Sequence, residues 1–205
     1  MTRLLIMGPP GSGKGTQAVR IADKMAIPAI STGDIFRYNV KELTELGKEA
    51  KTYIDSGNFV PDDVTNRMVA DRLNHSDVAN GFLLDGYPRT SGQVAALSEM
   101  LQEQGTSLTA VLVLEVPDEE IVERLLARAE TEGRSDDTEE VIKRRLELYH
   151  QETSDLIEEY IELGIVGRVD GTGAIDDITE RLLQTIYNIR ARTGTLPAVK
   201  PRNAK

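Results

Sequence analysis

Residues 8–16 (GPPGSGKGT) combine residue types that suit the binding of phosphate groups. Glycines allow consecutive backbone N–H groups to turn inward around an anion. The side chain of Lys14 can reach the outer phosphates of a ligand as a point charge. Gly8, Gly13 and Lys14 match the G-x-x-x-x-G-K pattern of phosphate-binding loops. The segment is therefore a candidate phosphate site, with an ordinary glycine-rich turn as the alternative.

The residues on both sides of this segment predict the strand and the helix that a phosphate-binding loop requires. An apolar run at residues 4–7 precedes it, and apolar residues recur at helical spacing in residues 17–25. The N-terminus of such a helix adds a positive dipole to an anion site. These flanks favour the phosphate loop over the turn. One position departs from the pattern, because Gly15 stands where Ser or Thr is usual and the hydroxyl follows at Thr16.

Composition limits the classes of protein to which the chain can belong. Its 205 residues suit one α/β domain with small insertions. There is no cysteine, which excludes disulfides and cysteine-ligated zinc, so we expect no structural zinc. No apolar run reaches membrane-spanning length, no signal-peptide pattern is present, and the net charge of −10 gives no overall basic surface for nucleic acid. We expect a soluble, cytoplasmic protein that binds neither membranes nor nucleic acid.

Short apolar runs alternate with helical patterns along the chain. This alternation predicts an α/β fold, with a five-stranded parallel sheet flanked by helices in three layers. Strands are expected at residues 4–7, 27–30, 82–84, 110–116 and 165–169. Helices are expected near residues 15–25, 33–39, 43–56, 62–74, 90–103, 118–129, 138–163 and 175–191.

Polar residues that follow the second and third expected strands are further candidates for ligand binding. Open α/β sheets bind ligands at the carboxyl ends of their strands, where Thr32, Arg37 and Asp85 are expected. A carboxylate at the end of a strand can help to hold Mg²⁺ through water. Each residue also has a simpler interpretation: Thr32 could cap the next helix, Arg37 could be solvated, and Asp85 could cap a helix or turn.

Three residues farther along the chain could also contact a nucleotide. The amide of Gln93 offers donors and an acceptor, so it can read the edge of a base. Arg124 and Arg128 are four residues apart on an expected helix and share one face. Ion pairs with Glu120 or Glu123 are the simpler interpretation for these arginines.

The order and spacing of these motifs resemble the adenylate kinases, within the nucleoside monophosphate kinase family, and the likeness runs from about residue 2 to residue 190. The residues that carry it, besides the glycine-rich loop, are STGDIFR at 31–37, DGYPRT at 85–90 with Gln93, the pair Arg124 and Arg128, and RSDD at 134–137 with Arg145.

The resemblance implies a P-loop NTPase-like fold and reversible phosphoryl transfer from MgATP to AMP, giving two ADP. It implies ATP-binding residues at Gly11, Ser12, Gly13, Lys14, Gly15, Thr16, Arg124, Arg128 and Gly173. It implies AMP-binding residues at Thr32, Arg37, Asn58, Phe59, Val60, Gly86, Tyr87, Pro88, Arg89, Gln93, Arg134 and Arg145. The catalytic residues that it implies are Lys14, Arg89, Arg124, Arg134 and Arg145. Thr16 and Asp85 would place the Mg²⁺ ion, Asp85 through water.

The resemblance also implies a division of the chain and a monomeric state. The core would comprise residues 1–30, 61–128 and 138–192, with a lobe that binds the nucleoside monophosphate at 31–60, a lid at 129–137 and a tail at 193–205. Only five residues separate Arg128 from Arg134, so the lid is of the short type. Long-lid relatives insert a small β-structure there, which sometimes holds zinc through cysteines.

Two other functions remain as alternatives at this point. The first is a kinase for UMP, CMP or another nucleoside monophosphate on the same frame. Pyrimidine-specific relatives favour asparagines around the motif in which this chain has Thr90 and Gln93, so adenine is favoured. The second is a nucleotide-binding sensor without turnover, which would typically lack the lysine or one of the arginines that this chain retains.

Overall fold

The computed structural model describes residues 1–132 and 138–194, and only the backbone of residues 128–132. Within this part of the chain, five strands form one parallel sheet in the order β2-β3-β1-β4-β5. The strands are β1 (Thr2–Met7), β2 (Ala29–Ser31), β3 (Gly81–Asp85), β4 (Ala110–Glu115) and β5 (Val166–Asp170). This confirms the expected α/β class and the parallel sheet.

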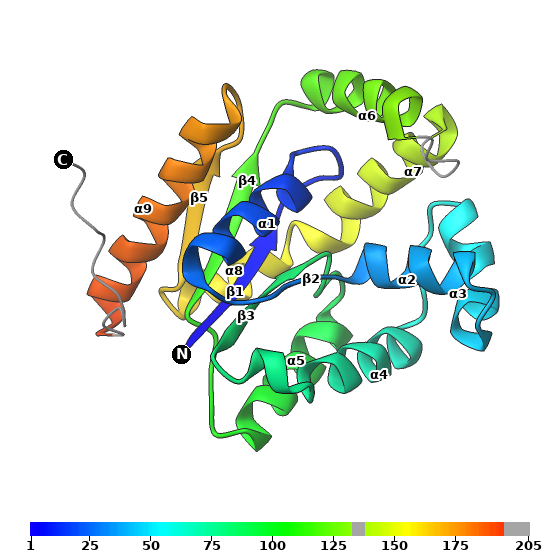
Figure 1. The fold of residues 1–205 in the computed structure, drawn as a ribbon. Coiled ribbons are helices and arrows are strands. Elements are labelled where there is room, and N and C mark those ends of the chain that lie inside the picture. The colour runs from blue at the N-terminus through cyan, green and yellow to red at the C-terminus, as the bar shows by residue number, and fades with distance from the viewer. Residues whose placement is uncertain (133–137, 195–205) are drawn as a thin grey trace.

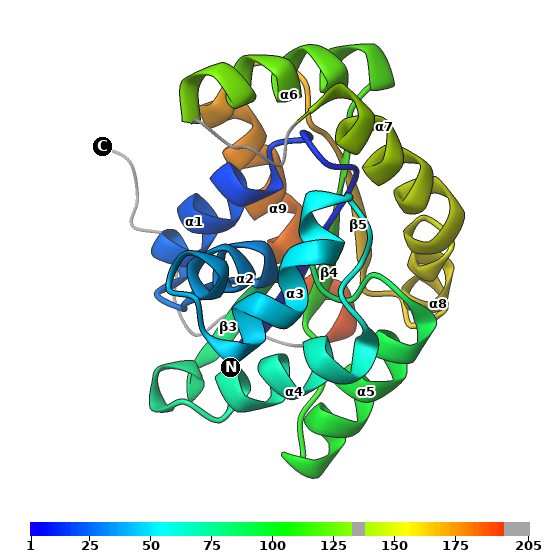
Figure 2. The same cartoon turned by 90° about the vertical axis from the view of Figure 1, so that its right-hand side faces the viewer.

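Helices cover both faces of the sheet (Figures 1 and 2). On one face lie α1 (Lys14–Met25) and α9 (Ile175–Thr193), which contact each other. On the other lie α5 (Ser91–Glu103) and α8 (Leu156–Glu162), and α4 (Asp62–Leu73) packs against α5. The three layers follow from right-handed crossovers between parallel strands.

The main core lies between the sheet and these helices. Strands β1, β3 and β4 are continuous apolar runs whose side chains are almost entirely buried, as strands covered on both faces must be. Register pairs Ile6 and Ser31 with Asp85, so the carboxyl ends of β1, β2 and β3 meet at one edge. The loops that leave this edge can therefore converge on one ligand.

Two helices between β2 and β3 form a smaller unit with a core of its own. They are α2 (Thr32–Lys41) and α3 (Glu45–Asp55), and their apolar residues Phe36 and Ala50 pack with Val60 and Val64. Ser31 and Thr44 cap the two helices by accepting bonds from the Asp34 and Gly47 N–H groups. The interpretation of Thr32 as the cap of the first helix is therefore wrong, because this helix begins one residue earlier than expected.

The expected helix at residues 138–163 is interrupted in the structure. It divides into α7 (Glu139–Leu148), a π-helical turn (Tyr149–Thr153) and α8. No Pro or Gly within residues 138–163 marks the change, and the periodicity of the sequence therefore does not reveal it. Helix α6 (Asp118–Glu132) contacts α7 through a third apolar cluster of Ile121, Leu125 and Ile142 with Val116.

A short 3₁₀ turn (Ser76–Val78) precedes β3. None of the helices in the described residues is both long enough and apolar enough to cross a membrane.

Candidate active site

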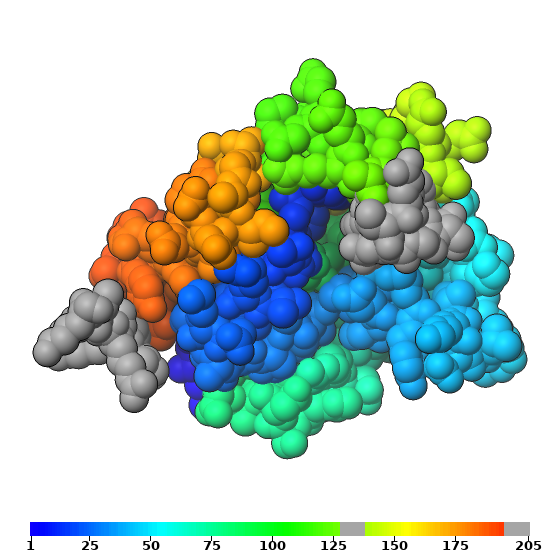
Figure 3. Space-filling model, turned by 45° about the horizontal axis from the view of Figure 1, so that its top comes forward, coloured from blue at the N-terminus to red at the C-terminus, as the bar shows by residue number. Residues whose placement is uncertain are grey.

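A cavity of about 830 Å³ opens at the carboxyl edge of the sheet. Figure 3 shows the hollow between α6, α1 and α2. It is lined by every predicted site residue whose side chain is described. Of the remaining two, Arg128 lies in α6 with an undescribed side chain and Arg134 lies outside the described residues. Such a volume is within the usual range for a small-molecule site.

The glycine-rich loop forms one wall of this cavity between β1 and α1. Gly8, Gly11 and Gly13 have φ values of 139°, 82° and 89°, which residues with a Cβ rarely adopt. A Cβ at Gly8 would also lie 2.6 Å from the Leu114 carbonyl oxygen. The loop therefore needs glycine both for its turn and for its close approach to β4. The Lys14 ammonium donates a hydrogen bond to the Pro9 carbonyl at 2.6 Å, which crosses the loop.

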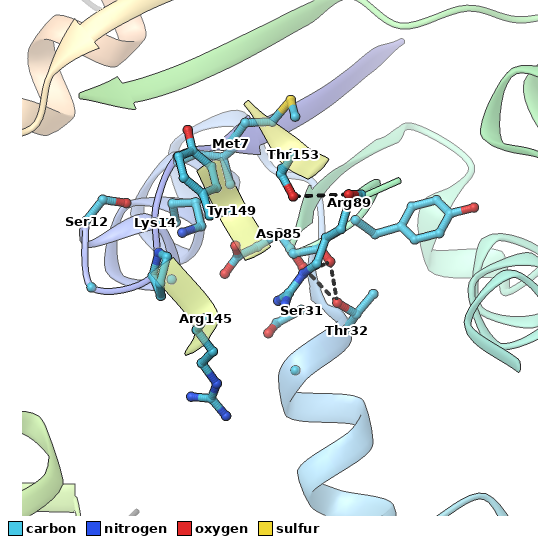
Figure 4. A pocket seen from close by; sticks show the side chains of 18 of the residues that line it. Met7, Ser12, Lys14, Ser31, Thr32, Asp85, Arg89, Arg145, Tyr149 and Thr153 are labelled. Carbon is cyan, nitrogen blue, oxygen red and sulfur yellow. Dashed lines mark hydrogen bonds between the residues drawn. The ribbon is translucent and has the colours of Figure 1, made fainter. Parts of the chain in front are cut away.

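A carboxylate lies next to the start of α1. Asp85 ends β3, and its Oδ2 is 3.6 Å from the position that a Cβ on Gly15 would take. Burial raises the pKa of Asp85, while the charges of Lys14 and Arg89 oppose the rise. Figure 4 shows Lys14, Asp85 and Arg89 directed toward the same space. Two cations and an acid thus meet between the glycine-rich loop and the turn after β3.

The turn after β3 holds Arg89 in place. The Gly86 carbonyl accepts hydrogen bonds from Arg89 Nε at 2.8 Å and from the Thr32 hydroxyl at 2.9 Å. The guanidinium carbon of Arg89 lies 5.4 Å from the centre of the Phe59 ring, a cation–π distance. Burial lowers the pKa of Arg89, Asp85 raises it, and the nearby charges of Arg145 and Arg37 lower it further. Four charged groups therefore surround this part of the cavity.

The next residues of the turn are tied to α4 and α5. The peptide bond between Tyr87 and Pro88 is cis. The buried Tyr87 phenol donates to Asn66 Oδ1 at 2.7 Å, and burial raises its pKa. The Gln93 side chain accepts from the Arg89 N–H and donates to Asp62, each at 2.8 Å. Gln93 therefore faces the cavity with both ends of its amide already anchored.

Arg124 forms the ion pair of its simpler interpretation and also lines the cavity. It forms an ion pair with Glu120 at 2.5 Å, as the simpler interpretation expects. It also lines the cavity and donates to the carbonyls of Gly171 at 3.1 Å and Ser12 at 3.4 Å. Arg124 thus joins the glycine-rich loop to the loop after β5, where Gly173 has a φ of 94° and lines the same cavity.

The residues expected from α2 and from the segment before α4 reach the opposite wall. Arg37 pairs with Asp34 on its own helix. Asn58 and Val60 line the cavity with Phe59, and the Asn58 Oδ1 accepts a hydrogen bond from Arg144 at 3.1 Å. This hydrogen bond joins α7 to residue 58.

Sequence reasoning missed two residues of the π-helical turn. Tyr149 and Thr153 both line the cavity, and the Thr153 hydroxyl donates to the Arg89 carbonyl at 3.0 Å. π-helical turns interrupt α-helices frequently at functional sites. Aromatic and hydroxyl residues four apart in a helical pattern carry no signal that would have identified them.

A buried hydroxyl in the glycine-rich loop has no hydrogen-bond partner. Ser12 is 1% exposed, and its Oγ is the only buried side-chain N or O atom in the described residues without a partner. Buried polar groups are almost always paired in native proteins. An unpaired hydroxyl in the wall of a cavity is what a loop awaiting a polar ligand would show.

The oxygen donors available suit a metal that arrives with its ligand. Among the described residues, no three His, Cys, Asp or Glu side chains cluster into a metal site. Thr16 and Asp85 nevertheless both line the cavity beside Lys14. A hydroxyl and one carboxylate are hard oxygen donors, which suit Mg²⁺ that keeps waters and phosphate oxygens as its other ligands.

Comparisons with known proteins agree with this geometry. The model of the family described as Adenylate kinase matches residues 6–165. The chain is 70% identical to a protein named Adenylate kinase from Micrococcus luteus over 201 residues, which cover 98% of each protein. It is 56% identical to one from Kocuria rhizophila, over 91% of this chain and 99% of that protein. It is 59% identical to one from Pseudarthrobacter chlorophenolicus, over 93% of this chain and 100% of that protein. With the family model matching most of its length, the chain belongs to the adenylate kinase family.

Proposed function

We propose that the cavity holds ATP and AMP together and that its residues catalyse reversible phosphoryl transfer between them, giving two ADP. Family membership supports this reaction over the alternative acceptors and over a sensor without turnover. The single observation that carries the assignment of residues is that the glycine-rich loop and the turn after β3 line one cavity, with Asp85 between Lys14 and Arg89.

The donor nucleotide belongs on the side of residues 8–16, which we call the phosphate loop. The backbone N–H groups of the loop and the N-terminus of α1 favour the donor phosphates. Lys14 contributes a charge that its bond to Pro9 keeps over the loop. Arg124 bridges from Ser12 to Gly171, which supports a place for the donor base between this arginine and Gly173.

The acceptor nucleotide belongs on the opposite side, which we call the acceptor wall. It consists of Thr32, Arg37, Phe59, Arg89 and Gln93. Arg89 and Arg37 have the planar donors that suit the phosphate of AMP. Gln93 has the amide that suits its base, and Phe59 offers an apolar surface on which a base or the Arg89 guanidinium can stack.

The chemistry needs positioning and charge stabilisation more than acid–base catalysis. An AMP phosphate oxygen attacks the γ-phosphorus of ATP, the bond from that phosphorus to the β–γ bridging oxygen breaks, and both products are ADP. Lys14, Arg89, Arg124 and Arg145 offset the charge that spreads over the transferring group. The attacking oxygen is already ionised, and no side chain has to remove its proton.

Thr16 and Asp85 are the residues that would hold Mg²⁺. When bound, the ion neutralises phosphate charge and orients the donor phosphates. Burial raises the pKa of Asp85, and the charges of Lys14 and Arg89 oppose this rise. In its ionised form the carboxylate would accept hydrogen bonds from the water ligands of the ion.

Closure of two segments over the substrates would exclude water from the reaction. We assign residues 31–60 as the acceptor lobe, since α2 and α3 pack around a core separate from that of the sheet. We assign residues 129–137 as the lid. Labels on these segments should approach each other when an inhibitor that joins both substrates binds, and an unchanged distance would contradict closure.

Product formation from MgATP with AMP, CMP, UMP, GMP or no acceptor tests the function directly. We expect rapid formation of ADP with AMP alone. A preference for CMP or UMP would keep the mechanism but reassign Gln93, and binding of ATP without transfer to any acceptor would favour the sensor. The family resemblance also supports a monomeric, cytoplasmic enzyme, and size-exclusion chromatography tests the first of these properties.

A further inference from the structure

A carboxylate behind the acceptor wall holds Gln93 in one orientation. Gln93 is 2% exposed and lines the cavity. Its Oε1 accepts from the Arg89 backbone N–H at 2.8 Å, and its Nε2 donates to Asp62 Oδ1 at 2.8 Å. Asp62 is not among the described residues that line the cavity. It therefore reaches the site only through Gln93.

The hydrogen-bonding chemistry of these two partners determines the orientation of the Gln93 amide. A backbone N–H can only donate a hydrogen bond, and a carboxylate can only accept one. If the Gln93 amide flipped, its carbonyl oxygen would face the Asp62 carboxylate and its NH₂ group would face the Arg89 N–H. Both contacts would become repulsive, and two buried polar groups would lose their partners.

The carboxylate is itself fixed by a second hydrogen bond. Its Oδ2 accepts from the Thr90 hydroxyl at 2.7 Å, and the Thr90 Oγ1 in turn accepts from the Gln93 backbone N–H at 3.2 Å. Three of these four hydrogen bonds close a ring through Gln93, Asp62 and Thr90, and each of the four donors meets an acceptor. The ring joins the start of α4 to the start of α5 and gives each oxygen of the Asp62 carboxylate a hydrogen-bond partner.

Two hydrogen-bonding positions of the Gln93 amide remain for a ligand. They are the second N–H of Nε2 and the second lone pair of Oε1. Adenine presents an amino N–H beside a ring-nitrogen acceptor, which a glutamine amide can bind with two hydrogen bonds. A 6-oxopurine presents an acceptor at position 6, beside the donor N1–H on one edge and the acceptor N7 on the other. An amide free to flip would bind the first of these edges, whereas a fixed amide cannot.

We propose that Asp62 is a positioning residue that makes the acceptor site select adenine over 6-oxopurines, by preventing the Gln93 amide from flipping. This inference rests on the proposed assignment of Gln93 to the base of AMP. The carboxylate contributes through its inability to donate, and an amide of the same shape at position 62 would lack this property.

Competition between AMP and IMP as acceptors tests the proposal, because their bases differ only in the hydrogen-bonding polarity at positions 6 and 1. The variant Asp62→Asn can donate or accept at position 62, so the contact with the Arg89 backbone N–H is the one that still opposes a flip of Gln93. We expect the ratio of kcat/KM for AMP to that for IMP to fall about tenfold or more. The change should lie in the KM of the acceptors, with the KM for ATP unchanged.

Asp63→Asn is the matched control. Asp63 is also in the first turn of α4, so the same charge is removed from the same helix end. Its side chain is 76% exposed and lies 3.8 Å from Arg67, outside the ring of hydrogen bonds. The ratio of kcat/KM for AMP to that for IMP should equal that of the unmodified enzyme.

Gln93→Ala separates a failure of this inference from a failure of the assignment beneath it. If Gln93→Ala abolishes the preference for AMP and Asp62→Asn leaves it intact, the inference is wrong and the assignment of Gln93 stands. If Gln93→Ala leaves the preference intact, both are wrong. A lower Tm of Asp62→Asn with equal losses for AMP and IMP would show a purely structural role and would also overturn the inference.

A second variant keeps the test independent of whether Asp62→Asn folds. Thr90→Val removes the hydrogen bond that holds the other oxygen of the Asp62 carboxylate, together with the bond that the Thr90 hydroxyl accepts from the Gln93 N–H. We expect the same loss of preference to a smaller extent, because Asp62 still accepts from Gln93 but is held at one point only. If the ratio of kcat/KM for AMP to that for IMP is unchanged in this variant, the proposal is wrong.

Discussion

The phosphate loop and the acceptor wall face each other across one cavity, but they are built from different parts of the chain. The phosphate loop is nine consecutive residues, and its shape comes from glycine φ angles and from β1, which is buried on both faces. The acceptor wall takes residues from α2, from the segment before α4, from the turn after β3 and from α5. In the proposed function, backbone N–H groups bind the ligand in the first region, and anchored side chains bind it in the second.

This difference predicts different responses to substitution. A donor site made of backbone N–H groups tolerates changes to most of its side chains and depends on the few charged ones. An acceptor site made of side chains depends on hydrogen bonds among residues that never touch the substrate. Substitutions in the phosphate loop should therefore affect the KM for ATP, and substitutions in the acceptor wall should affect the KM for AMP.

The largest effect is expected from Lys14→Met. Loss of the ammonium removes a charge at the transferring group, and kcat should fall about 10²- to 10³-fold. The fold should persist, because Lys14 is not part of the hydrophobic core, and circular dichroism should show unchanged secondary structure. Lys24→Met, in the last turn of the same helix, is the control and should keep full activity. Normal turnover of Lys14→Met would contradict the role of the phosphate loop in catalysis.

Arg89→Lys should act on the acceptor side. Lysine keeps the charge but has neither a planar fork of donors nor an Nε to bond the Gly86 carbonyl. We expect kcat/KM for AMP to fall about tenfold to hundredfold, because a bidentate contact to phosphate is replaced by a point charge. Initial rates at varied AMP and fixed, saturating ATP measure this. Equal losses at varied ATP would contradict the separation of the two regions.

The sequence predicted the phosphate loop more completely than the acceptor wall, for a physical reason. Glycine, lysine and the flanking apolar runs are local signals, and local signals determine a loop between a buried strand and a helix. The anchoring of Gln93 by Asp62 joins residues 31 positions apart, and the contact of Thr153 with Arg89 joins residues 64 positions apart. Such pairs depend on how α4, α5 and the π-helical turn pack, and no pattern within one segment encodes them.

The elements themselves were predicted well where apolar runs were continuous. All five strands overlap the runs that indicated them, although β2 begins two residues later than expected, and α2 begins one residue earlier. The π-helical turn at Tyr149–Thr153 was missed because a helix of regular period and one with an inserted residue have nearly the same composition. Residues 133–137, including Arg134, lie outside the described residues, and their assigned roles remain predictions.

Asp85→Asn should lower the activity and raise the melting temperature. Burial raises the pKa of Asp85 in the folded state, so the folded protein binds a proton more tightly than the unfolded chain. The free energy of unfolding is then lost as pH rises above the ordinary Asp value of about 3.9. We expect the ligand-free variant to melt a few degrees higher than the unmodified protein at pH 7, with no difference well below pH 3.9. Activity should be lost, and a lower Tm at pH 7 would contradict the cause assigned to the shift.

The smallest effect is expected from Thr153→Val, which keeps the shape of the side chain. It removes the hydrogen bond to the Arg89 carbonyl and should cost about 1 kcal/mol of the free energy of unfolding. The KM for AMP should rise a few-fold, while the KM for ATP should stay the same. Urea denaturation measures the first effect and initial rates measure the second. A change in the KM for ATP alone would contradict the assignment of Thr153 to the acceptor side.

A crystal structure with an inhibitor in which a chain of phosphates joins two adenosines tests the central claim most directly. We predict that one adenine lies against Gln93 and the other between Arg124 and Gly173, with the phosphates running from the phosphate loop past Asp85 to Arg89. An adenine bound away from Gln93, or a phosphate chain that contacts only one of the two regions, would contradict the division of the cavity into a donor side and an acceptor side.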